Sequence, residues 1–455
     1  MAGLSMRIVG RHLNGGGLAA RVLRGSMVTL IGFGGGQALR LVSNLILTRL
    51  LVPEAFGLMM LVTVLIIGLK MFSDIGIAQS ILRSPRGDEQ LFLDTAWSLD
   101  LIRGALLWGL ACLLARPMAD FYDIPQLAQL LPVTALVLLI GGFEPTRVDT
   151  AARHMELGRI TAFELASQAC GILVMIGLAA LTGSVWALVA GQIVASLIRL
   201  GLMVRGLPGQ GNRFRIDPTA LRELLGFGIW IFASTVAGYL AAQGDKLVLS
   251  KFLTLEMLGI YNIGYFLAAV PGMLGGALVG RLMIPLYRER PPSASAANFA
   301  ALRRFRFLLS GSLVGLGLFL AVIGVWLVGL LYDPRYAAAG PVLVLLSLAF
   351  LPQLIVQSYD QIALTVGASR MFCLVSVARG ALMLACVGAG AAWLGLKGAV
   401  LGQALAYLLS YPIVAWLAWR YGAWDPVHDA IMGLVSIVGA GFALWLHAAT
   451  IAALP

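Results

Sequence analysis

The chain has 455 residues, of which 60% are hydrophobic and only 12% are charged, and its mean hydropathy is +0.92. Soluble domains carry about 25% charged residues, so this composition excludes a soluble protein and indicates an integral membrane protein. The formal net charge is +11, but the bases lie in short stretches between apolar blocks, where they set membrane orientation rather than bind nucleic acid.

The first half of the chain predicts six membrane-spanning helices. A tail at residues 1–24 contains several bases and a run of three glycines, and we expect it to be cytoplasmic. Each apolar block after it is long enough to cross a hydrocarbon core about 30 Å thick. The six blocks lie at about residues 26–48, 56–82, 91–114, 127–143, 160–181 and 185–204, within a predicted bundle at 25–205.

The second half predicts six more spans and one that has no counterpart. A stretch rich in Gly, Pro and Arg at 206–220 is the expected cytoplasmic linker. A second bundle at 221–420 follows, with spans at about 221–252, 257–287, 307–331, 341–366, 371–394 and 396–419, and 421–455 holds an extra helix. We therefore expect an all-α membrane protein with about 12 to 13 transmembrane helices in two six-helix bundles.

An internal repeat relates the two halves. The run from Leu47 to Gly57 reads LTRLLVPEAFG, and the run from Leu249 to Gly259 reads LSKFLTLEMLG. Base, acid and glycine align without a gap, which composition alone does not readily produce. Because an even number of spans separates the two copies, we expect the halves to be related by a pseudo-two-fold axis along the membrane normal.

Polar side chains recur at helical spacing on the first helix of each predicted bundle. An ionised residue at mid-bilayer costs about 2.5 to 3.5 kcal/mol, so such residues need a partner or a wet cavity. We interpret the two stripes as facing a central cleft that binds substrate, with interhelical hydrogen bonding as the alternative. The stripes are Gln37, Arg40, Asn44 and Thr48 in the first half and Thr235, Tyr239, Gln243 and Lys246 in the second.

Further ionisable residues lie inside later spans. Asp100 and Arg103 are three residues apart and could neutralise each other. Lys70 and Asp74 are four residues apart and could likewise neutralise each other. The alternative is a role in ion coupling, and we predict Asp74 and Asp360 as candidate ion-coupling acids. Asp360 is expected on one face of a helix with Gln353, Gln357 and Gln361, and Arg379 is expected either to pair with it or to contact substrate.

The sequence shows no pattern for metal, cofactor or hydrolytic chemistry. Its four cysteines and four histidines are scattered, without metal-ligand spacing. It has no Walker motif and no nucleophile elbow, so we predict that the chain is not an enzyme and uses no metal or cofactor.

The repeat itself carries a family resemblance. The run from Leu47 to Gly57, followed by Phe-Ser-Asp-Ile-Gly at 72–76, resembles the opening signature of the polysaccharide transporter family, the Wzx-type flippases of the MATE-like (MOP) superfamily. Gly-Asp-Lys at 244–246, Leu-Gly-Ile-Tyr at 258–261 and Pro285 resemble the second-half pattern of that family. The similarity covers about residues 21–420.

The resemblance implies a function and its partners. Such proteins move polyprenyl-diphosphate-linked oligosaccharides across the bacterial inner membrane by alternating access, using a cationic cavity. The expected partners are this lipid-linked substrate, membrane lipid, and a polysaccharide polymerase or chain-length regulator. If the N-terminus is cytoplasmic, most of the basic residues lie at cytoplasmic ends of the spans or in cytoplasmic loops, in agreement with the positive-inside rule.

Two alternatives remain at this stage, and a third is disfavoured. A peptidoglycan-precursor flippase and a cation-coupled multidrug exporter would share the same fold. A membrane polymerase or glycosyltransferase would need a large hydrophilic loop, and the loops of this sequence are too short for one.

Overall fold

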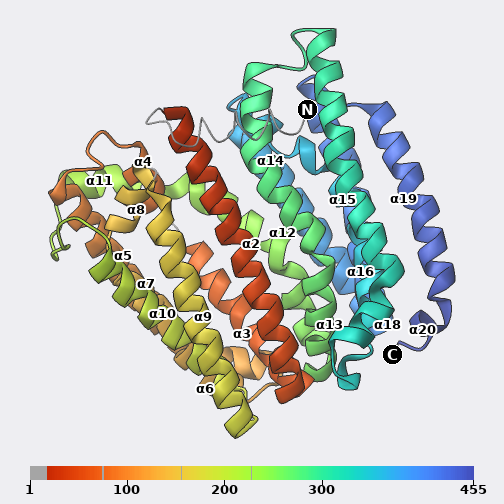
Figure 1. Cartoon of the computed structure of the whole chain (residues 1–455), viewed down its shortest axis with the longest axis horizontal. Coiled ribbons are helices and arrows are strands. Elements are labelled where there is room, and N and C mark those ends of the chain that lie inside the picture. Colours follow the sequence, from red (N-terminus) through yellow and green to blue (C-terminus); the bar gives the residue numbers. More distant parts are fainter. Residues whose placement is uncertain (1–17, 74–75, 155, 227, 455) are drawn as a thin grey trace, which may run out of the picture. The chain divides into compact units, whose positions relative to one another are not determined.

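The computed structural model describes residues 18–73, 76–154, 156–226 and 228–454, and every regular element in them is a helix (Figure 1). Nine helices among these residues are long and apolar enough to cross a membrane, or ten if the bent pair at 127–142 and 147–153 forms one span. The expected class, an all-α multi-pass membrane protein, is confirmed. The division into two six-helix bundles stays a prediction.

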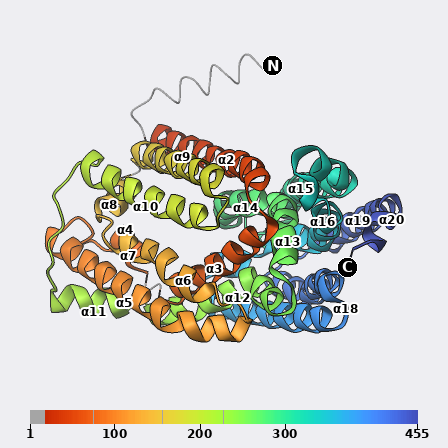
Figure 2. The same ribbon diagram turned by 90° about the horizontal axis from the view of Figure 1, so that it is seen from below.

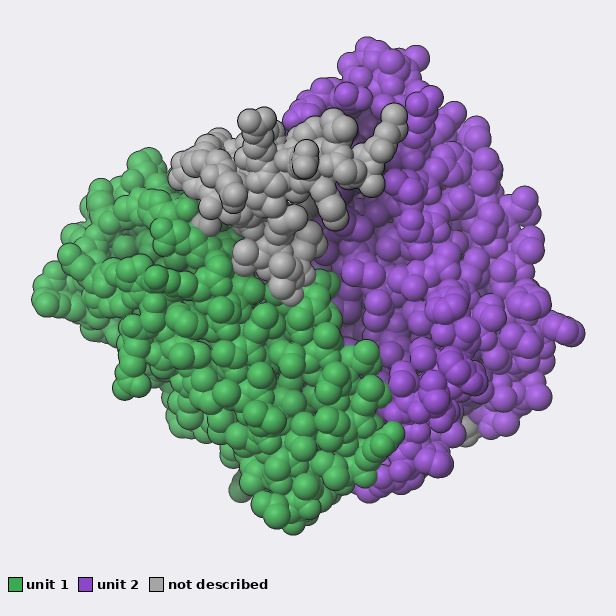
Figure 3. All heavy atoms as spheres, viewed as in Figure 1, with its two compact units in different colours: residues 1–51, 65–232 green, residues 52–64, 233–455 purple. Residues whose placement is uncertain are grey.

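The chain forms two compact units, which Figure 3 shows in different colours. Unit 1 comprises residues 1–51 and 65–232, and unit 2 comprises residues 52–64 and 233–455. The first copy of the repeat thus ends within unit 2, which also holds the whole second copy. The predicted bundle borders at 25–205 and 221–420 stay predictions.

Unit 1 is built around the antiparallel neighbours α9 and α10, and α2 packs against α9 on its other side (Figure 2). A second group forms where α5 packs against α6 and α7. The helices are α2 (Leu18–Leu50), α4 (Ile77–Arg83), α5 (Gln90–Tyr122), α6 (Leu127–Thr134), α7 (Leu136–Gly142), α8 (Arg147–Arg153), α9 (Leu157–Thr182), α10 (Trp186–Gly206) and α11 (Pro218–Gly226).

Unit 2 surrounds its most buried helix, α16 (Ala339–Val356), with α13, α15, α18 and α19. The helix α3 (Pro53–Phe72) begins in this unit, and most of α12 (Gly228–Phe252) lies in it. The other elements are α13 (Leu255–Ala268), α14 (Val270–Glu289), α15 (Ala296–Leu331), η1 (Pro334–Tyr336), η2 (Gln357–Tyr359), α17 (Ile362–Thr365), α18 (Ser369–Arg420), α19 (Pro426–Leu446) and α20 (Ala448–Ala452).

The two copies of the repeat meet through their glycines. A Cβ atom added at Gly57 would lie 2.0 Å from the carbonyl oxygen of Leu255, and one added at Gly259 would lie 2.0 Å from that of Pro53. Pro53 and Leu255 are themselves equivalent positions of the repeat. Each copy therefore uses the same two positions to contact the other, which is the pattern of a local two-fold axis. The backbones approach so closely that only glycine, which has no Cβ atom, fits at these two positions.

One predicted span is interrupted, and one long helix is broken at a predicted border between spans. The span expected at 56–82 is divided into α3 and α4, and Gly76 at the start of α4 adopts a left-handed conformation with φ of 73°. The 52-residue helix α18 contains non-helical Leu394 and Gly395, at the predicted border between the spans 371–394 and 396–419.

The expectation that one continuous helix carries Gln353, Gln357, Asp360 and Gln361 is wrong. The helix α16 ends at Val356 and tightens into the 3₁₀ turn η2. Pro352 lies within the last turns of α16 and cannot donate the hydrogen bond that would continue its regular pattern. Gln357 and Asp360 are therefore presented from a turn rather than from one helical face.

The predicted linker is hydrogen-bonded along part of its length to α5. Between α10 and α11 the backbone N–H groups of Arg213, Arg215 and Asp217 donate to buried side chains of α5, with distances of 3.0 Å to Asp94 Oδ1, 2.9 Å to Ser98 Oγ and 3.1 Å to Thr95 Oγ1. Alternate residues are bonded, as in an extended strand. Asp217 also accepts from Thr219 and from the N–H of Ala220, and these bonds lower the pKa of its carboxyl.

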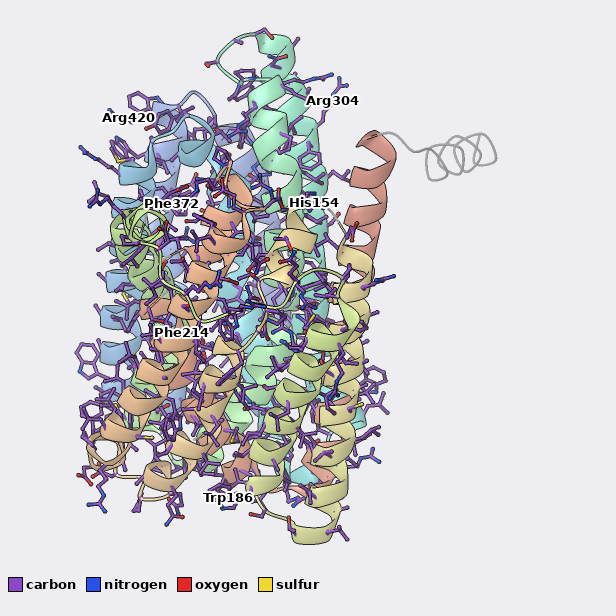
Figure 4. All side chains as sticks on the ribbon, turned by 90° about the vertical axis from the view of Figure 1, so that its left-hand side faces the viewer. His154, Trp186, Phe214, Arg304, Phe372 and Arg420 are labelled. Atoms are coloured by element: carbon purple, nitrogen blue, oxygen red, sulfur yellow. The ribbon has the colours of Figure 1, made fainter. Side chains whose placement is uncertain are left out.

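The extra C-terminal helix is fastened to unit 2 at its first turn. Asp425 caps α19 by accepting from the N–H of His428 at 3.2 Å, and Arg303 Nη2 of α15 donates to Asp425 at 2.9 Å. Tyr359 donates to Asp429 Oδ1 at 2.9 Å. Arg304 and Arg420 lie at the same end of unit 2 (Figure 4). In unit 1, Trp186 lies at the opposite end from His154 (Figure 4).

We predict that replacing Gly259 by Ala destabilises the protein by about 1 to 3 kcal/mol, because a methyl group would overlap the Pro53 carbonyl. The thermal midpoint of the detergent-solubilised protein measures the loss. Gly329→Ala is the matched control, since nothing lies within 4 Å of its added Cβ. Equal midpoints for the two variants would contradict the close approach of the repeats.

Candidate functional site

Two polar cavities lie within the helices, one inside each unit. The cavity of unit 1, called cavity 1, has a volume of about 580 Å³ and is lined by α3, α4, α5, α7, α8, α10 and the turn before α8. The cavity of unit 2, called cavity 2, has a volume of about 380 Å³ and is lined by α12, α13, α14, α16, η2 and α18. Both volumes fall in the range of about 300 to 1,000 Å³ that is usual for small-molecule sites.

Cavity 1 concentrates ionisable side chains of both signs. Arg103 Nη2 lies 2.9 Å from Asp100 Oδ1. Arg199 forms an ion pair with Glu144 and a second one, at 3.3 Å, with Glu164. The lining includes three bases and three acids, so their formal charges balance: Lys70, Arg103, Arg199, Asp100, Glu144 and Asp149.

Local backbone geometry brings these groups together. A Cβ added at Gly104 of α5 would lie 2.8 Å from the carbonyl oxygen of Leu138 and 3.2 Å from the Cα of Gly142 in α7. This close approach places the end of α7 against the charged turn of α5. The chain then bends by 60° before α8, and Glu144 lies at that bend, where it reaches Arg199 of α10.

Sequence reasoning missed half of cavity 1. It singled out Lys70, Asp100 and Arg103, but it did not single out Glu144, Asp149 or Arg199. The signal for Glu144 was an acid followed by proline directly after an apolar block. Its partner Arg199 is 55 residues away, and no local spacing relates them.

Cavity 2 has a different chemistry. Arg379 Nη1 donates to Asp360 Oδ1 at 2.9 Å, and Arg379 Nη2 donates to the amide oxygen of Gln353. The side chains of Arg379 and Asp360 are 18% and 20% exposed, so the pair is largely shielded from solvent. The structure thus brings together two predicted residues, Arg379 and Asp360, whose roles in binding and coupling stay predictions.

Three aromatic rings form a ladder along cavity 2. Tyr265 and Phe350 meet edge to face with centroids 5.7 Å apart, and Phe350 meets Tyr407 in the same manner at 5.9 Å. Edge-to-face packing fixes the rings relative to one another. All three line the cavity together with Ser376 and Ser410.

The predicted polar stripe of α12 contacts one of these three rings, that of Tyr265. Lys246 Nζ lies 3.9 Å from the centroid of the Tyr265 ring and donates to Gln243 Oε1 at 2.8 Å. Asp245 lies 3.8 Å from the same amine and accepts from Tyr261 at 2.7 Å. The hydroxyl of Tyr239 donates to the carbonyl of Val64 at 2.9 Å. Neither Lys246, Gln243 nor Tyr239 lines cavity 2.

The stripe of α2 lies in unit 1, away from the lining of cavity 1. Arg40 is exposed and Gln37 and Asn44 are half-buried. The Thr48 hydroxyl donates to the carbonyl of Asn44 at 2.8 Å. Contact of these residues with substrate stays a prediction. Asp74, the other predicted coupling acid, lies outside the described residues.

Known proteins share this architecture. Among solved structures, the lipid II flippase MurJ in an inward closed conformation has a TM-score of 0.69 at 12% identity, covering 93% of this chain and 92% of that one. An inward-facing multidrug resistance MATE family transporter of the MOP superfamily has a TM-score of 0.57 at 14% identity, covering 85% and 95%. The fold is therefore that of MOP-superfamily transporters.

Sequence relatives narrow the class. A family described as "Polysaccharide biosynthesis protein" matches residues 46–341, and the chain belongs to this family, as its resemblance predicted. The succinoglycan biosynthesis transport protein ExoT of Rhizobium meliloti (strain 1021) is 23% identical over 69% of this chain. The lipopolysaccharide biosynthesis protein WzxC of Escherichia coli (strain K12) is 26% identical over 70%. The chain spans 63% of the length of each of these two relatives.

We predict that Arg199→Ala destabilises the protein by about 1 to 3 kcal/mol, because Glu144 and Glu164 lose their base while all three groups are partly exposed. The double variant Arg199→Ala/Glu144→Gln should recover part of that loss, since one of the two carboxylates left without the base becomes neutral. Thermal midpoints of the four members of this cycle measure the coupling. Strictly additive effects would show that the pair does not hold the cavity.

Proposed function

We propose that the chain is a secondary transporter, a flippase that moves polyprenyl-diphosphate-linked oligosaccharide across the bacterial inner membrane for polysaccharide biosynthesis or export. The observation that carries this proposal is the presence of two cavities with polar and charged linings inside membrane-spanning helices of a chain in the polysaccharide biosynthesis family. Two relatives bear names of polysaccharide transport or biosynthesis, which supports a sugar-containing substrate.

Cavity 1 is suited to the diphosphate. Arg103 and Arg199 each lie against carboxylates that compensate their charge. A guanidinium binds phosphate in the same bidentate geometry as a carboxylate. An arriving diphosphate would therefore exchange with Asp100 and Glu144, and neither the empty nor the loaded state would leave the arginines without an anionic partner.

Asp360 is suited to ion coupling. Its carboxylate lies against Arg379 on the short turn that follows α16. Gain of a proton would neutralise Asp360 and release Arg379, so a transmembrane proton gradient would change the charge of cavity 2. Asp74 is proposed as a second coupling acid on the grounds of its position in the sequence.

The polar stripe of α2 is proposed to contact substrate outside cavity 1, and the polar stripe of α12 is proposed to support the substrate site of unit 2. In unit 1, Gln37, Arg40 and Asn44 follow one face of α2. In unit 2, Lys246 donates to Gln243 and Tyr239 donates to the Val64 carbonyl. Their proposed contribution is to hold the Tyr265 ring and the backbone at Val64 in place for the substrate.

The orientation and partners follow the same proposal. Arg304 and Arg420 at one end of unit 2 (Figure 4) favour that end as cytoplasmic, with the N-terminus inside. A polymerase or chain-length regulator is the proposed protein partner. The fold match to MurJ keeps a peptidoglycan-precursor flippase as the second candidate, and the family match favours the oligosaccharide.

Deleting the gene should cause lipid-linked oligosaccharide to accumulate in the inner membrane, and the wild-type gene should reverse this. Arg40→Ala should fail to restore export at normal protein abundance, because substrate loses a cationic contact. Arg290→Ala, an exposed base in a loop, is the control and should complement fully. Extraction and quantification of the lipid-linked pool distinguish the outcomes; full complementation by Arg40→Ala would remove that residue from the route.

Asp360→Asn should reduce transport at least about tenfold, because the amide cannot carry the coupling proton. Export is measured in cells and again after the proton gradient is collapsed. Wild-type export should fall on collapse, and the residual export of Asp360→Asn should not. Asp120→Asn, at an exposed acid of α5, should behave like wild type. A gradient-dependent Asp360→Asn variant would contradict the coupling role.

A further inference from the structure

Cavity 2 differs from cavity 1 in its charge. Arg379 is the only ionised residue among those that line cavity 2 in the described part of the chain, and Asp360 compensates it at 2.9 Å. Cavity 1 presents six ionisable side chains. A diphosphate entering cavity 2 would find one base that is already paired and no second cation, so its charge would stay largely uncompensated.

The hydrogen-bonding groups of cavity 2 can be counted from their existing partners. A guanidinium has five N–H donors, and Arg379 uses two of them for Asp360 and Gln353. The other N–H groups remain for a ligand. The hydroxyl of Ser376 donates to Phe372 at 2.8 Å and that of Ser410 donates to Ala406 at 2.6 Å, so each presents only oxygen lone pairs to a ligand.

This combination suits hydroxyl groups. A sugar hydroxyl accepts a bond from Arg379 through its oxygen and donates its own proton to a serine oxygen. A phosphate at neutral pH mainly accepts, so it would face the serine oxygens without a proton between them. The amides of Gln353 and Gln357, which also line the cavity, can form hydrogen bonds but bring no charge.

The apolar part of the lining suits the carbon skeleton of a sugar. Tyr265, Phe350 and Tyr407 give three aromatic rings in fixed relative orientation. Lys246 lies against the Tyr265 ring and adds to its fixation. Rings of this kind pack against the C–H face of a pyranose while its hydroxyls reach the polar wall.

We propose that cavity 2 is a saccharide subsite that binds an uncharged sugar of the transported oligosaccharide, while the diphosphate is bound elsewhere. This inference rests on the proposed function. It assigns Ser376 and Ser410 as acceptors, Arg379 as the donor and Tyr265 and Tyr407 as the stacking surface.

The test uses the purified full-length protein in lipid nanodiscs with free N-acetylglucosamine, galactose, glucuronic acid and inorganic pyrophosphate as probes. Saturation-transfer difference NMR detects weak binding through the sugar protons. We expect signals from a neutral sugar, and we expect that inorganic pyrophosphate does not reduce them. Absence of signal from both neutral sugars, or their displacement by pyrophosphate, would overturn the proposal. A signal confined to glucuronic acid would also overturn it, because it would show recognition of charge.

Two matched variants locate the binding. Ser376→Ala removes one acceptor and should weaken neutral-sugar binding about fivefold, the effect of one hydrogen bond of about 1 kcal/mol. Ser196→Ala is the control, because Ser196 makes the same bond to its own helix at 3.0 Å but lines cavity 1. Ser376→Trp should fill cavity 2 and abolish the signal. Equal sugar binding by wild type and both Ser376 variants would place the sugar elsewhere.

Failure of this proposal and failure of the proposed function are distinguishable. If the deletion strain accumulates lipid-linked oligosaccharide but the sugars do not bind at cavity 2, the transport function stands and the subsite falls. If the deletion strain accumulates none, the transport function falls whatever the NMR result.

Discussion

The cost of an ionised side chain inside a membrane governs the placement of the polar residues in this protein. Asp360 lies against Arg379, Glu144 against Arg199, and Lys246 against Gln243 and Asp245. A residue left uncompensated there would cost several kcal/mol. The pairs of Glu144 with Arg199 and of Asp360 with Arg379 join separate elements, and each lies at one of the two cavities.

The ion pairs between arginines and carboxylates change the way in which a cationic cavity is expected to bind an anionic substrate. From the sequence, we expected a cavity with basic side chains that bind an anionic headgroup. Among the described residues, Arg103, Arg199 and Arg379 already have carboxylate partners. Under the proposed function, binding of the diphosphate is an exchange of partners, in which the protein loses one ion pair as it gains another. Such an exchange lets a single site be stable both empty and loaded, which an alternating-access transporter requires. The two cavities differ in the number of such pairs, since the lining of cavity 1 includes three bases and three acids and the lining of cavity 2 includes one base.

Much of the fold could be predicted because its signals are local. Apolar blocks marked the helices, Gly395 marked the break inside α18, and the repeat of Pro53–Gly57 at Leu255–Gly259 marked a pair of turns that meet through their glycines. The continuous helix expected through Asp360 failed because Pro352 and the 3₁₀ turn η2 end α16 early. The site was harder to predict. The pair of Arg199 and Glu144, the docking of Arg213 on Asp94 and the aromatic ladder depend on tertiary contacts between residues far apart in sequence.

The central claim is that both cavities are hydrated and reached by the transported lipid-linked sugar. Single cysteines at Ala269 in cavity 2 and Ser196 in cavity 1, placed in a protein that lacks its four native cysteines, test it most directly with a membrane-impermeant thiol reagent. The account predicts labelling at both positions in intact membranes, and protection of both when lipid-linked oligosaccharide accumulates. Labelling of either cysteine only after denaturation would contradict it.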